Sequence, residues 1–355
     1  MILAYITIAI ALFFAMNIGA SGAAATMGPA YGSGAVKQKY LALILAGSGA
    51  LLGAVVGGGE VVKTVGEGII PKNIFSLEVA LVILLSATLT LFLANMIGIP
   101  LSTSEVTIGA VVGVGIAFQA LYVNQVLYIV SFWLLVPVVA FVLCYIFGKV
   151  IQLMERRWPQ LTGKGVWKKG LAILLVVTGF VEAFSAGMNN VANAIGPLVG
   201  AGIMEQSSGI WLGGIFVALG AILFGGKVLE TNGKKIISFS LLEGTAVSGT
   251  GGGLVIIASV FGIPVPLTQA TTAGIVGIGC ARSGFQLWQK GVIKKIVKVW
   301  VVSPVLSLVM SYSLIHVFLH PNPYMMVIVL AIIVATIGTL NLYKSVRLEQ
   351  QTVQQ

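Results

Sequence analysis

The chain has 355 residues, of which 58% are hydrophobic and only 8% are charged, and its mean hydropathy is +1.05. A soluble protein of this length cannot bury so large an apolar fraction in a core of ordinary proportions, so this composition excludes a soluble globular enzyme and favours a membrane protein. The net charge of +10 does not indicate nucleic-acid binding, because the basic residues lie between and beside the apolar runs; membrane lipid is the expected partner.

Long apolar runs recur along the chain, and most of them approach or exceed the roughly 20 residues that a helix needs to cross the hydrocarbon of a bilayer. They lie at about 2–16, 41–58, 77–97, 122–151, 170–188, 208–226, 236–262, 292–319 and 324–343. The sequence therefore predicts an all-α polytopic membrane protein. Residues 17–36 and 98–120 are apolar but rich in glycine, so each either crosses the membrane or enters it and returns.

The first of these glycine-rich segments occurs twice. Residues 15–34 (AMNIGASGAAATMGPAYGSG) align without gaps to residues 183–202 (AFSAGMNNVANAIGPLVGAG), with several glycines and a proline in register. Apolar segments broken by glycine, proline and polar residues are typical of discontinuous helices, which build solute sites near the middle of a bilayer. The duplication predicts two internal structural repeats and indicates transport.

The second glycine-rich segment is also duplicated, at an offset of 164 residues: 98–117 (GIPLSTSEVTIGAVVGVGIA) returns at 262–281 (GIPVPLTQATTAGIVGIGCA). In each copy an apolar run ends at a proline, and a new helix is predicted to begin with polar side chains in its first turn. These side chains are Ser102, Thr103 and Ser104 in one copy, and Thr268, Gln269, Thr271 and Thr272 in the other. We predict a re-entrant hairpin near 98–120 and another near 262–284.

Helix starts present unpaired N–H groups and a partial positive charge, so two of them facing each other would form an anion site. The alternative is that the serines and threonines only cap the helices or allow close helix packing. Because the hydroxyl groups recur at matched positions in both copies, we favour the anion site.

A basic segment separates the two copies. Its cationic residues are Lys149, Arg156, Arg157, Lys164, Lys168 and Lys169, and the positive-inside rule predicts that it is cytoplasmic. We divide the chain into a first repeat (1–150), a basic linker (151–169), a second repeat (170–320), and a further C-terminal span with a polar tail (321–355). An odd number of crossings in each half would invert the second repeat, and inverted repeats are the arrangement that we expect.

These motifs resemble those of the inorganic phosphate transporter (PiT) family. Its duplicated signature reads Gly-x-Asn-Asp-Val-Ala-Asn-Ala, and a Pro-x-Ser-Thr-Thr-His motif accompanies it in each half. Residues 187–197 (GMNNVANAIGP) are a near match to the signature, and residues 19–29 (GASGAAATMGP) are a degraded copy. Residues 100–105 (PLSTSE) match the second motif well and residues 264–269 (PVPLTQ) match it loosely.

The resemblance covers nearly the whole chain. It implies a two-repeat secondary transporter that carries a tetrahedral oxyanion with a coupling cation. The expected location is the plasma membrane, as the inner membrane of a bacterium, and a homodimer is also implied.

The chain departs from the family at the acidic position of the signature. Gly22 and Asn190 stand where the family has Asp, and all ten acidic residues of the chain are Glu. Phosphate keeps an O–H that can donate to a carboxylate, whereas sulfate offers only acceptors. A carboxylate about 4 Å from a dianion would repel it by roughly 8 kcal/mol at an effective dielectric constant of 20, whereas an amide N–H attracts it. The pattern is similar to the sulfate permease (CysP-like) branch of the family and predicts import of sulfate or a related tetrahedral oxyanion.

The resemblance also implies a set of substrate-binding residues, position by position. They are Ser21, Asn189, Asn190 and Asn193 from the discontinuous helices, and Ser102, Thr103, Ser104 and Thr268 from the hairpins. Ala25 and Leu267 stand where the family has polar side chains, so the two halves should contribute unequally. No catalytic residue, cofactor or metal site is expected, since the two cysteines and two histidines lack the spacing of metal ligands.

The coupling ion is expected to be a proton or sodium. Loss of both Asp residues removes the usual charged ligands for sodium. Glu105 and Glu182 lie within apolar segments, and we predict that they carry protons in a proton–sulfate symport; the alternative is that each is a hydrogen-bonded packing residue.

The alternative functions are a sodium-coupled phosphate symporter, a passive anion channel and a membrane-embedded enzyme. The enzyme is disfavoured because hydrolytic chemistry on phosphorylated lipids usually needs clustered acidic metal ligands or a histidine nucleophile, and the sequence has neither.

Overall fold

A computed structural model describes residues 1–96, 101–162, 165, 167–236, 239–284, 292–324 and 327–328. Within these ranges the regular secondary structure is helical, and eight helices are long and apolar enough to cross a membrane. They match the first eight predicted spans. The ninth, at 324–343, lies almost entirely outside the described residues, and so do residues 97–100 at the start of the first predicted hairpin turn.

The helices follow one another in the same order in both halves. In the first half they are α1 (Ile2–Ile18), the π-helix η1 (Gly19–Ala23), α2 (Ala24–Thr26), α3 (Gly28–Gly32), α4 (Lys39–Gly57), α5 (Gly59–Glu67), the 3-10 helix η2 (Lys72–Ile74), α6 (Leu77–Met96), α7 (Thr103–Ala117) and α8 (Val123–Arg157). After the 3-10 helix η3 (Pro159–Thr162) come α9 (Trp167–Gly200), α10 (Gln206–Phe224), α11 (Gly226–Ile236), α12 (Leu241–Val260), α13 (Leu267–Ser283), α14 (Val292–Leu314) and the π-helix η5 (Ile315–Leu319).

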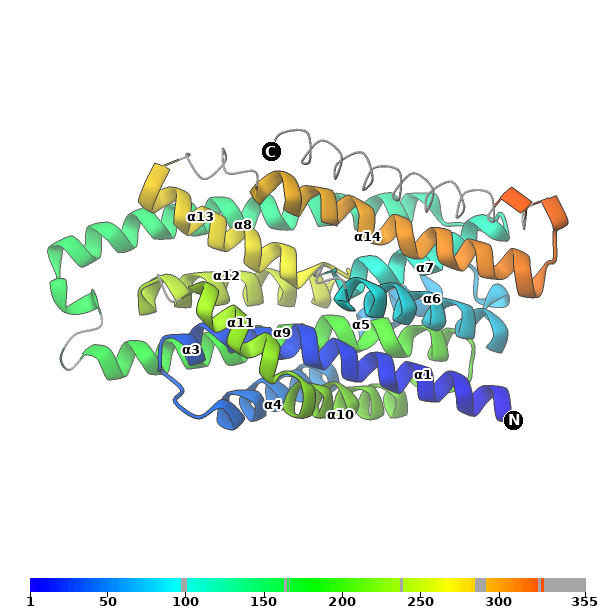
Figure 1. Cartoon of the computed structure of the whole chain (residues 1–355), viewed down its shortest axis with the longest axis horizontal. Coiled ribbons are helices and arrows are strands. Elements are labelled where there is room, and N and C mark those ends of the chain that lie inside the picture. The colour runs from blue at the N-terminus through cyan, green and yellow to red at the C-terminus, as the bar shows by residue number, and fades with distance from the viewer. Residues whose placement is uncertain are drawn as a thin grey trace, which may run out of the picture.

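The helix pairs α6–α7 and α12–α13 enter the molecule from opposite ends. Figure 1 shows α6 and α7 in the right half of the long axis and α12 and α13 in the left half. The starts of α7 and α13 meet near the middle, where the Ser104 hydroxyl donates to the Val265 carbonyl at 3.4 Å. Two helix starts therefore face each other inside the molecule, as the duplicated motifs predicted.

Local sequence signals explain the second of these pairs. At the start of α12, Ser240 and Glu243 form a capping box: the Glu243 N–H donates to the Ser240 hydroxyl at 3.3 Å, and the Ser240 N–H donates to the Glu243 carboxyl at 2.8 Å. At the end of α12, Gly262 has a φ of 69°, and the N–H groups of Gly262 and Ile263 donate back to Ser259 and Ala258. This Schellman motif reverses the chain and leads it into α13.

The two repeats interlock through matched close contacts. A Cβ atom at Gly19, in η1, would overlap the Val217 carbonyl of α10, and a Cβ atom at Gly187, in α9, would overlap the Ala50 carbonyl of α4. Gly19 and Gly187 are equivalent positions of the duplicated segment, and each packs against the other half of the chain. Small residues let membrane helices approach this closely. Gly19 therefore allows close packing against α10, and Gly187 allows close packing of α9 against α4.

One expectation of the sequence differs from the structure. Residues 187–197 do not interrupt their helix: α9 continues from Trp167 to Gly200 through the whole second signature. The asparagine side chains there bond to neighbouring elements and leave the backbone ladder of α9 intact. In the first copy, by contrast, η1 widens the helix into a π-turn, a feature that often marks functional sites.

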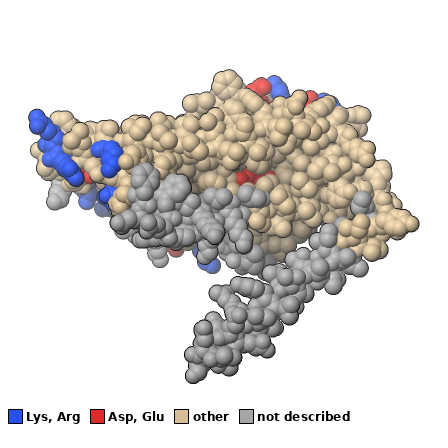
Figure 2. Space-filling model, turned by 90° about the horizontal axis from the view of Figure 1, so that it is seen from above, with Lys and Arg blue, Asp and Glu red and all other residues tan. Residues whose placement is uncertain are grey.

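Cationic residues gather at one end of the molecule. Figure 2 shows Lys and Arg concentrated at the left end, where Figure 1 places the turn between α8 and α9. Arg156 and Arg157 end α8, and Lys168 and Lys169 begin α9. Lys39, at the start of α4, pairs with Glu230 of α11 at 2.7 Å.

Candidate functional site

A buried group of amides and hydroxyls lies where the start of α7 meets the middle of α9. We call Thr103, Ser104, Asn190 and Asn193 the amide–hydroxyl cluster. Asn190 and Asn193 lie three residues apart and therefore share one face of α9. All four side chains are at most 8% exposed, so their polar atoms must pair with one another or with a ligand.

The cluster is held together by mutual hydrogen bonds. The hydroxyls of Thr103 and Ser104 donate to the Asn190 Oδ1 atom at 3.3 and 3.2 Å. The Asn193 Nδ2 atom lies 3.3 Å from the Thr103 hydroxyl, 3.2 Å from the Ser104 hydroxyl and 3.3 Å from the Asn190 Oδ1 atom. The hydroxyls can rotate and the amides carry N–H groups, so the cluster can present several donors to an anion.

The start of α7 adds backbone donors to the same place. Ser102 precedes the helix as its N-cap but makes no capping hydrogen bond with its side chain. The first intrahelical hydrogen bond runs from the Val106 N–H to the Ser102 carbonyl, at 3.1 Å. The N–H groups of Thr103, Ser104 and Glu105 consequently have no partner within the helix, and the helix dipole is positive there. This combination is a favourable environment for an oxyanion.

Asn189 has a different position from its neighbour Asn190. Its Nδ2 atom donates to the Ser259 hydroxyl at 2.8 Å and to the Ile263 carbonyl at 3.0 Å, and its Oδ1 atom accepts from the Val265 N–H at 3.1 Å. Both N–H groups of the amide are therefore used by the turn between α12 and α13. In this structure Asn189 positions that turn, and its Oδ1 atom also lies 3.4 Å from the Ser104 hydroxyl of the amide–hydroxyl cluster; its role in substrate binding stays a prediction.

The remaining predicted substrate residues lie at different distances from the cluster. Ser21 is half-buried in η1, and its hydroxyl donates to the Asn17 carbonyl at 2.8 Å. The adjacent Gly22 faces the cluster, because a Cβ atom there would lie 3.7 Å from the Asn190 Nδ2 atom. Thr268 is exposed in the first turn of α13, and no hydrogen bond joins it to the cluster within the described part of the chain.

Glu105 lies beside the cluster but bonds in another direction. Its buried carboxyl accepts hydrogen bonds from the Gln269 amide and from the Ser303 hydroxyl of α14. It lines a mostly apolar cavity of about 370 Å³ between α7, α8 and α14, together with Trp133 and Trp300. Both carboxyl oxygens have donors, so the carboxyl does not point at the amide–hydroxyl cluster.

Glu105 and Gln269 are also equivalent positions of the 164-residue repeat, and they contact each other. Gly22 and Asn190, equivalent positions of the other duplicated segment, likewise face each other. A pseudo-twofold axis between the halves accounts for both pairs, since such an axis brings equivalent residues together only where they lie close to it.

Glu182, the other predicted proton carrier, lies about two turns before Asn190 on α9. One oxygen of its buried carboxyl accepts a hydrogen bond from the Thr271 hydroxyl of α13 at 2.7 Å. The other oxygen has no hydrogen-bond partner. Glu182 is therefore separate from the amide–hydroxyl cluster and only half satisfied.

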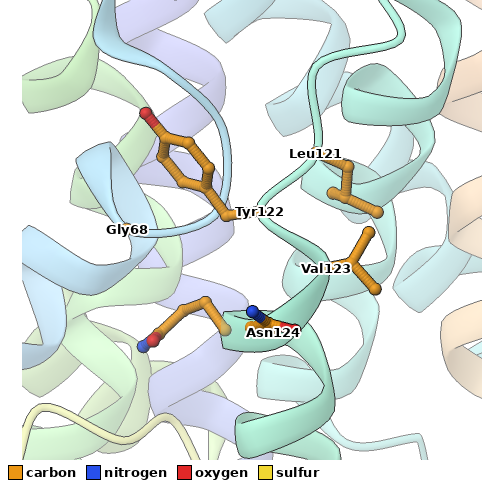
Figure 3. A pocket seen from close by; sticks show the side chains of 6 residues that line it. Gly68, Leu121, Tyr122, Val123 and Asn124 are labelled. Atoms are coloured by element: carbon orange, nitrogen blue, oxygen red, sulfur yellow. The ribbon is translucent and has the colours of Figure 1, made fainter.

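A larger cavity, of about 510 Å³, lies away from these residues. Figure 3 shows its lining at the connection between α7 and α8, with the Tyr122 ring and the Asn124 side chain beside Gly68. It contains none of the predicted site residues. Its volume is therefore no guide to the amide–hydroxyl cluster, whose polar side chains bond to one another.

Sequence reasoning missed several residues that position the site. Trp133 of α8 donates from its indole N–H to the Pro264 carbonyl at 2.9 Å, Ser259 binds Asn189, and Ser303 binds Glu105. None of the three lies in a recognisable motif. The Glu105–Gln269 contact could have been found from the repeat, because residues on a pseudo-axis pair with their own equivalents.

Comparison with known proteins gives a consistent result. The phosphate transporter family matches the chain twice, at residues 18–168 and 161–311. The protein named sulfate permease CysP, from Bacillus subtilis (strain 168), is 55% identical over 343 residues, which cover 96% of each chain. A solved structure described as the sodium-dependent phosphate transporter superposes with a TM-score of 0.78 at 22% identity, covering 91% of this chain and 100% of that chain.

Replacing Asn189 and Asn190 in separate variants should distinguish a residue that positions the α12–α13 turn from one that belongs to the amide–hydroxyl cluster. We expect Asn189→Ala to lower the thermal stability of the purified protein, because each buried group that it leaves unpaired costs roughly 1–3 kcal/mol. Asn190→Ala should change the melting temperature less, since Asn190 bonds only to rotatable hydroxyls and to Asn193. Melting temperatures of both variants, measured in the same detergent, check this expectation. A smaller loss for Asn189→Ala than for Asn190→Ala would contradict it.

Proposed function

Because the chain belongs to the phosphate transporter family, as a multi-pass membrane transporter and not an enzyme, we propose that it imports sulfate as a secondary active transporter, by proton symport. The observation that carries the proposal is the chemistry of the amide–hydroxyl cluster. Its four side chains are two amides and two hydroxyls, with no carboxylate among them, and the uncapped start of α7 adds backbone N–H groups.

Sulfate is the oxyanion that such a site favours. It is fully deprotonated near neutral pH, so every contact that it makes with the protein must come from a donor. Amide, hydroxyl and backbone N–H groups supply donors without adding negative charge. A carboxylate in the same place would repel the dianion and favour an anion that retains a proton.

The relatives support this assignment to different degrees. The Bacillus subtilis relative that is named a sulfate permease matches nearly the whole chain at 55% identity. The solved phosphate transporter, at 22% identity, supports the fold alone. A sodium-coupled phosphate symporter is therefore the alternative, and Asn190 at the family's acidic position argues against it.

The arrangement of the hairpins supports a carrier over a channel. The α6–α7 and α12–α13 pairs enter from opposite ends and meet at the cluster, as inverted repeats would arrange them (Figure 1). A site closed between two such pairs can open to one side at a time, which is how alternating access works. We place the basic end, with the α8–α9 turn, in the cytoplasm.

Proton coupling can be tested on the wild-type protein. We expect an inward proton gradient, imposed on proteoliposomes with the membrane potential clamped, to raise sulfate accumulation, because Glu105 and Glu182 offer carboxyls that can carry protons. An inward sodium gradient at constant pH is the matched control and should leave accumulation unchanged. Accumulation that follows sodium and ignores pH would support the sodium-coupled alternative.

Counterflow should identify the substrate. Proteoliposomes loaded with unlabelled sulfate are expected to take up labelled sulfate transiently above equilibrium, because a carrier exchanges its substrate across the membrane. External phosphate at the same concentration as sulfate should compete weakly, since a tenfold difference in affinity needs only about 1.4 kcal/mol of discrimination. Strong phosphate counterflow without sulfate counterflow would reject sulfate as the substrate.

Restoring the acidic residue should alter selectivity. We expect Asn190→Asp to lower sulfate transport at least tenfold and to raise the relative competition by phosphate, because the new carboxylate repels a dianion but can accept from a phosphate O–H. Asn190→Ala is the matched control, which removes the amide without adding charge and should not favour phosphate. Competition assays in proteoliposomes at neutral pH measure both effects.

A further inference from the structure

Glu182 lies in a second buried polar group, distinct from the amide–hydroxyl cluster. Its carboxyl is 1% exposed, and only one of its oxygens accepts a hydrogen bond, from Thr271. Glu105 differs, because both of its oxygens accept from a neighbouring side chain. Of the two predicted proton carriers, Glu182 is therefore the one whose second oxygen is available to bind a ligand.

A hydroxyl group of α12 lies beside this carboxyl. It belongs to Ser248, whereas Thr250, two residues further along α12 and therefore on another face of the helix, lies next to Cys144 of α8. Apart from each other, neither the buried Ser248 hydroxyl nor the second Glu182 oxygen has a hydrogen-bond partner. Buried polar groups usually pair, so this carboxyl oxygen and the hydroxyl beside it point to a ligand.

The charge of this carboxyl is not balanced by a nearby side chain. Within the described residues, no Lys or Arg pairs with Glu182. The elements packed around it present Cys144 from α8, Ser248 and the glycines 251 and 252 from α12, and Thr271 from α13. An ionised carboxylate buried without a partner costs several kcal/mol, so this one needs a bound cation or proton.

Comparison between the repeats shows that the carboxyl is specific to the second half. The position equivalent to Glu182 in the first half is Phe14, which is fully buried in the apolar core. Thr107 and Ser86, equivalent to Thr271 and Thr250, keep their hydroxyls there without a partner. The first half thus has the hydroxyls without the acid, so a single cationic ligand per chain is the expectation.

The geometry favours a proton over a metal ion. Hard metal cations that are bound by oxygen atoms take about six ligands. Here the side chains offer only one carboxyl and two hydroxyls, those of Ser248 and Thr271. The neighbouring backbone carbonyls belong to the continuous helices α9 and α12, and the Glu182 carbonyl accepts from the Ser185 hydroxyl at 2.7 Å.

We propose that Glu182, with Ser248 and Thr271 beside it, is the binding site of the coupling proton, and that it is separate from the anion site. The proposal rests on the proposed function, because it names the place where the symported proton binds. Proton binding occupies the free carboxyl oxygen and makes the carboxyl a donor to a neighbouring hydroxyl.

The same contacts connect this site to the anion site. Thr271 lies one turn into α13, so its hydrogen bond to Glu182 holds the start of that helix against α9. Just before α13, the Val265 N–H bonds to Asn189, and the Val265 carbonyl accepts from Ser104 of the amide–hydroxyl cluster. A change at Glu182 can therefore move the hairpin that closes the anion site.

The test compares exchange with proton-driven accumulation in the same proteoliposomes. Glu182→Gln should retain sulfate counterflow within about threefold of wild type, which is less than 1 kcal/mol, but should lose accumulation driven by a pH gradient. Glu182→Asp, which keeps a carboxyl, should restore that accumulation at least in part. Glu67→Gln, at an exposed residue paired with Lys72, is the matched control and should behave as wild type.

The outcomes separate the two proposals. Absence of sulfate counterflow in the wild type would overturn the proposed function, whereas pH-driven accumulation that persists in Glu182→Gln would overturn only the role of Glu182. Wild-type accumulation driven by sodium and lost in Glu182→Gln would assign the site to a metal cation and also overturn the proposal.

A measurement on the unmutated protein covers the case in which Glu182→Gln does not fold. A lipophilic carbodiimide reacts with protonated carboxyls inside membranes, so peptide mass mapping should find Glu182 modified in wild-type proteoliposomes, more at acidic than at alkaline pH. Uptake should fall in parallel with the modification. Lack of modification at every pH, with full inhibition of uptake, would exclude Glu182 as the proton site.

Discussion

The need to pair every polar group inside the hydrocarbon shapes the centre of this protein. Two helical hairpins stop in the interior, and the turn between α12 and α13 leaves backbone groups there that no helix satisfies. Asn189 binds this turn at Ile263 and Val265, and Trp133 binds it at Pro264. These bonds fix the start of α13 opposite the start of α7, and the amide–hydroxyl cluster forms between the start of α7 and α9.

Duplication supplies the framework, and divergence between the copies supplies the function. Matched glycines at positions 19 and 187 pack each half against the other, so equivalent positions make equivalent close contacts. The side chains at the centre do not follow that symmetry. Asn190 faces Gly22, which has no side chain, and the Glu105 carboxyl accepts a hydrogen bond from the Gln269 amide. The two residues of each pair therefore differ in chemistry. An asymmetric site can bind an anion in one orientation and place a proton elsewhere.

The proposed anion and proton sites have opposite electrostatic character, and the structure keeps them apart on α9. The cluster around Asn190 contains donors without a carboxylate, whereas Glu182 sits about two turns away among hydroxyls. Direct contact between a carboxylate and a dianion would be repulsive. Coupling through α13 avoids this repulsion, because the hairpin touches both sites while the two charges remain separated.

The sequence by itself determined the medium, the duplication and most of the chemistry. Its apolar runs predicted the eight membrane helices of the described region, and its motifs selected Thr103, Ser104, Asn190 and Asn193, which the structure brings together. Only the tertiary structure decided that α9 runs unbroken, that Asn189 binds a backbone turn while Asn190 faces the cluster, and that Thr268 is exposed. The physical reason is that a motif fixes which residue types are present and their spacing along one helix. Which partner each side chain meets depends on helices far away in sequence, such as α8 and α14, whose contributions at Trp133 and Ser303 belong to no motif.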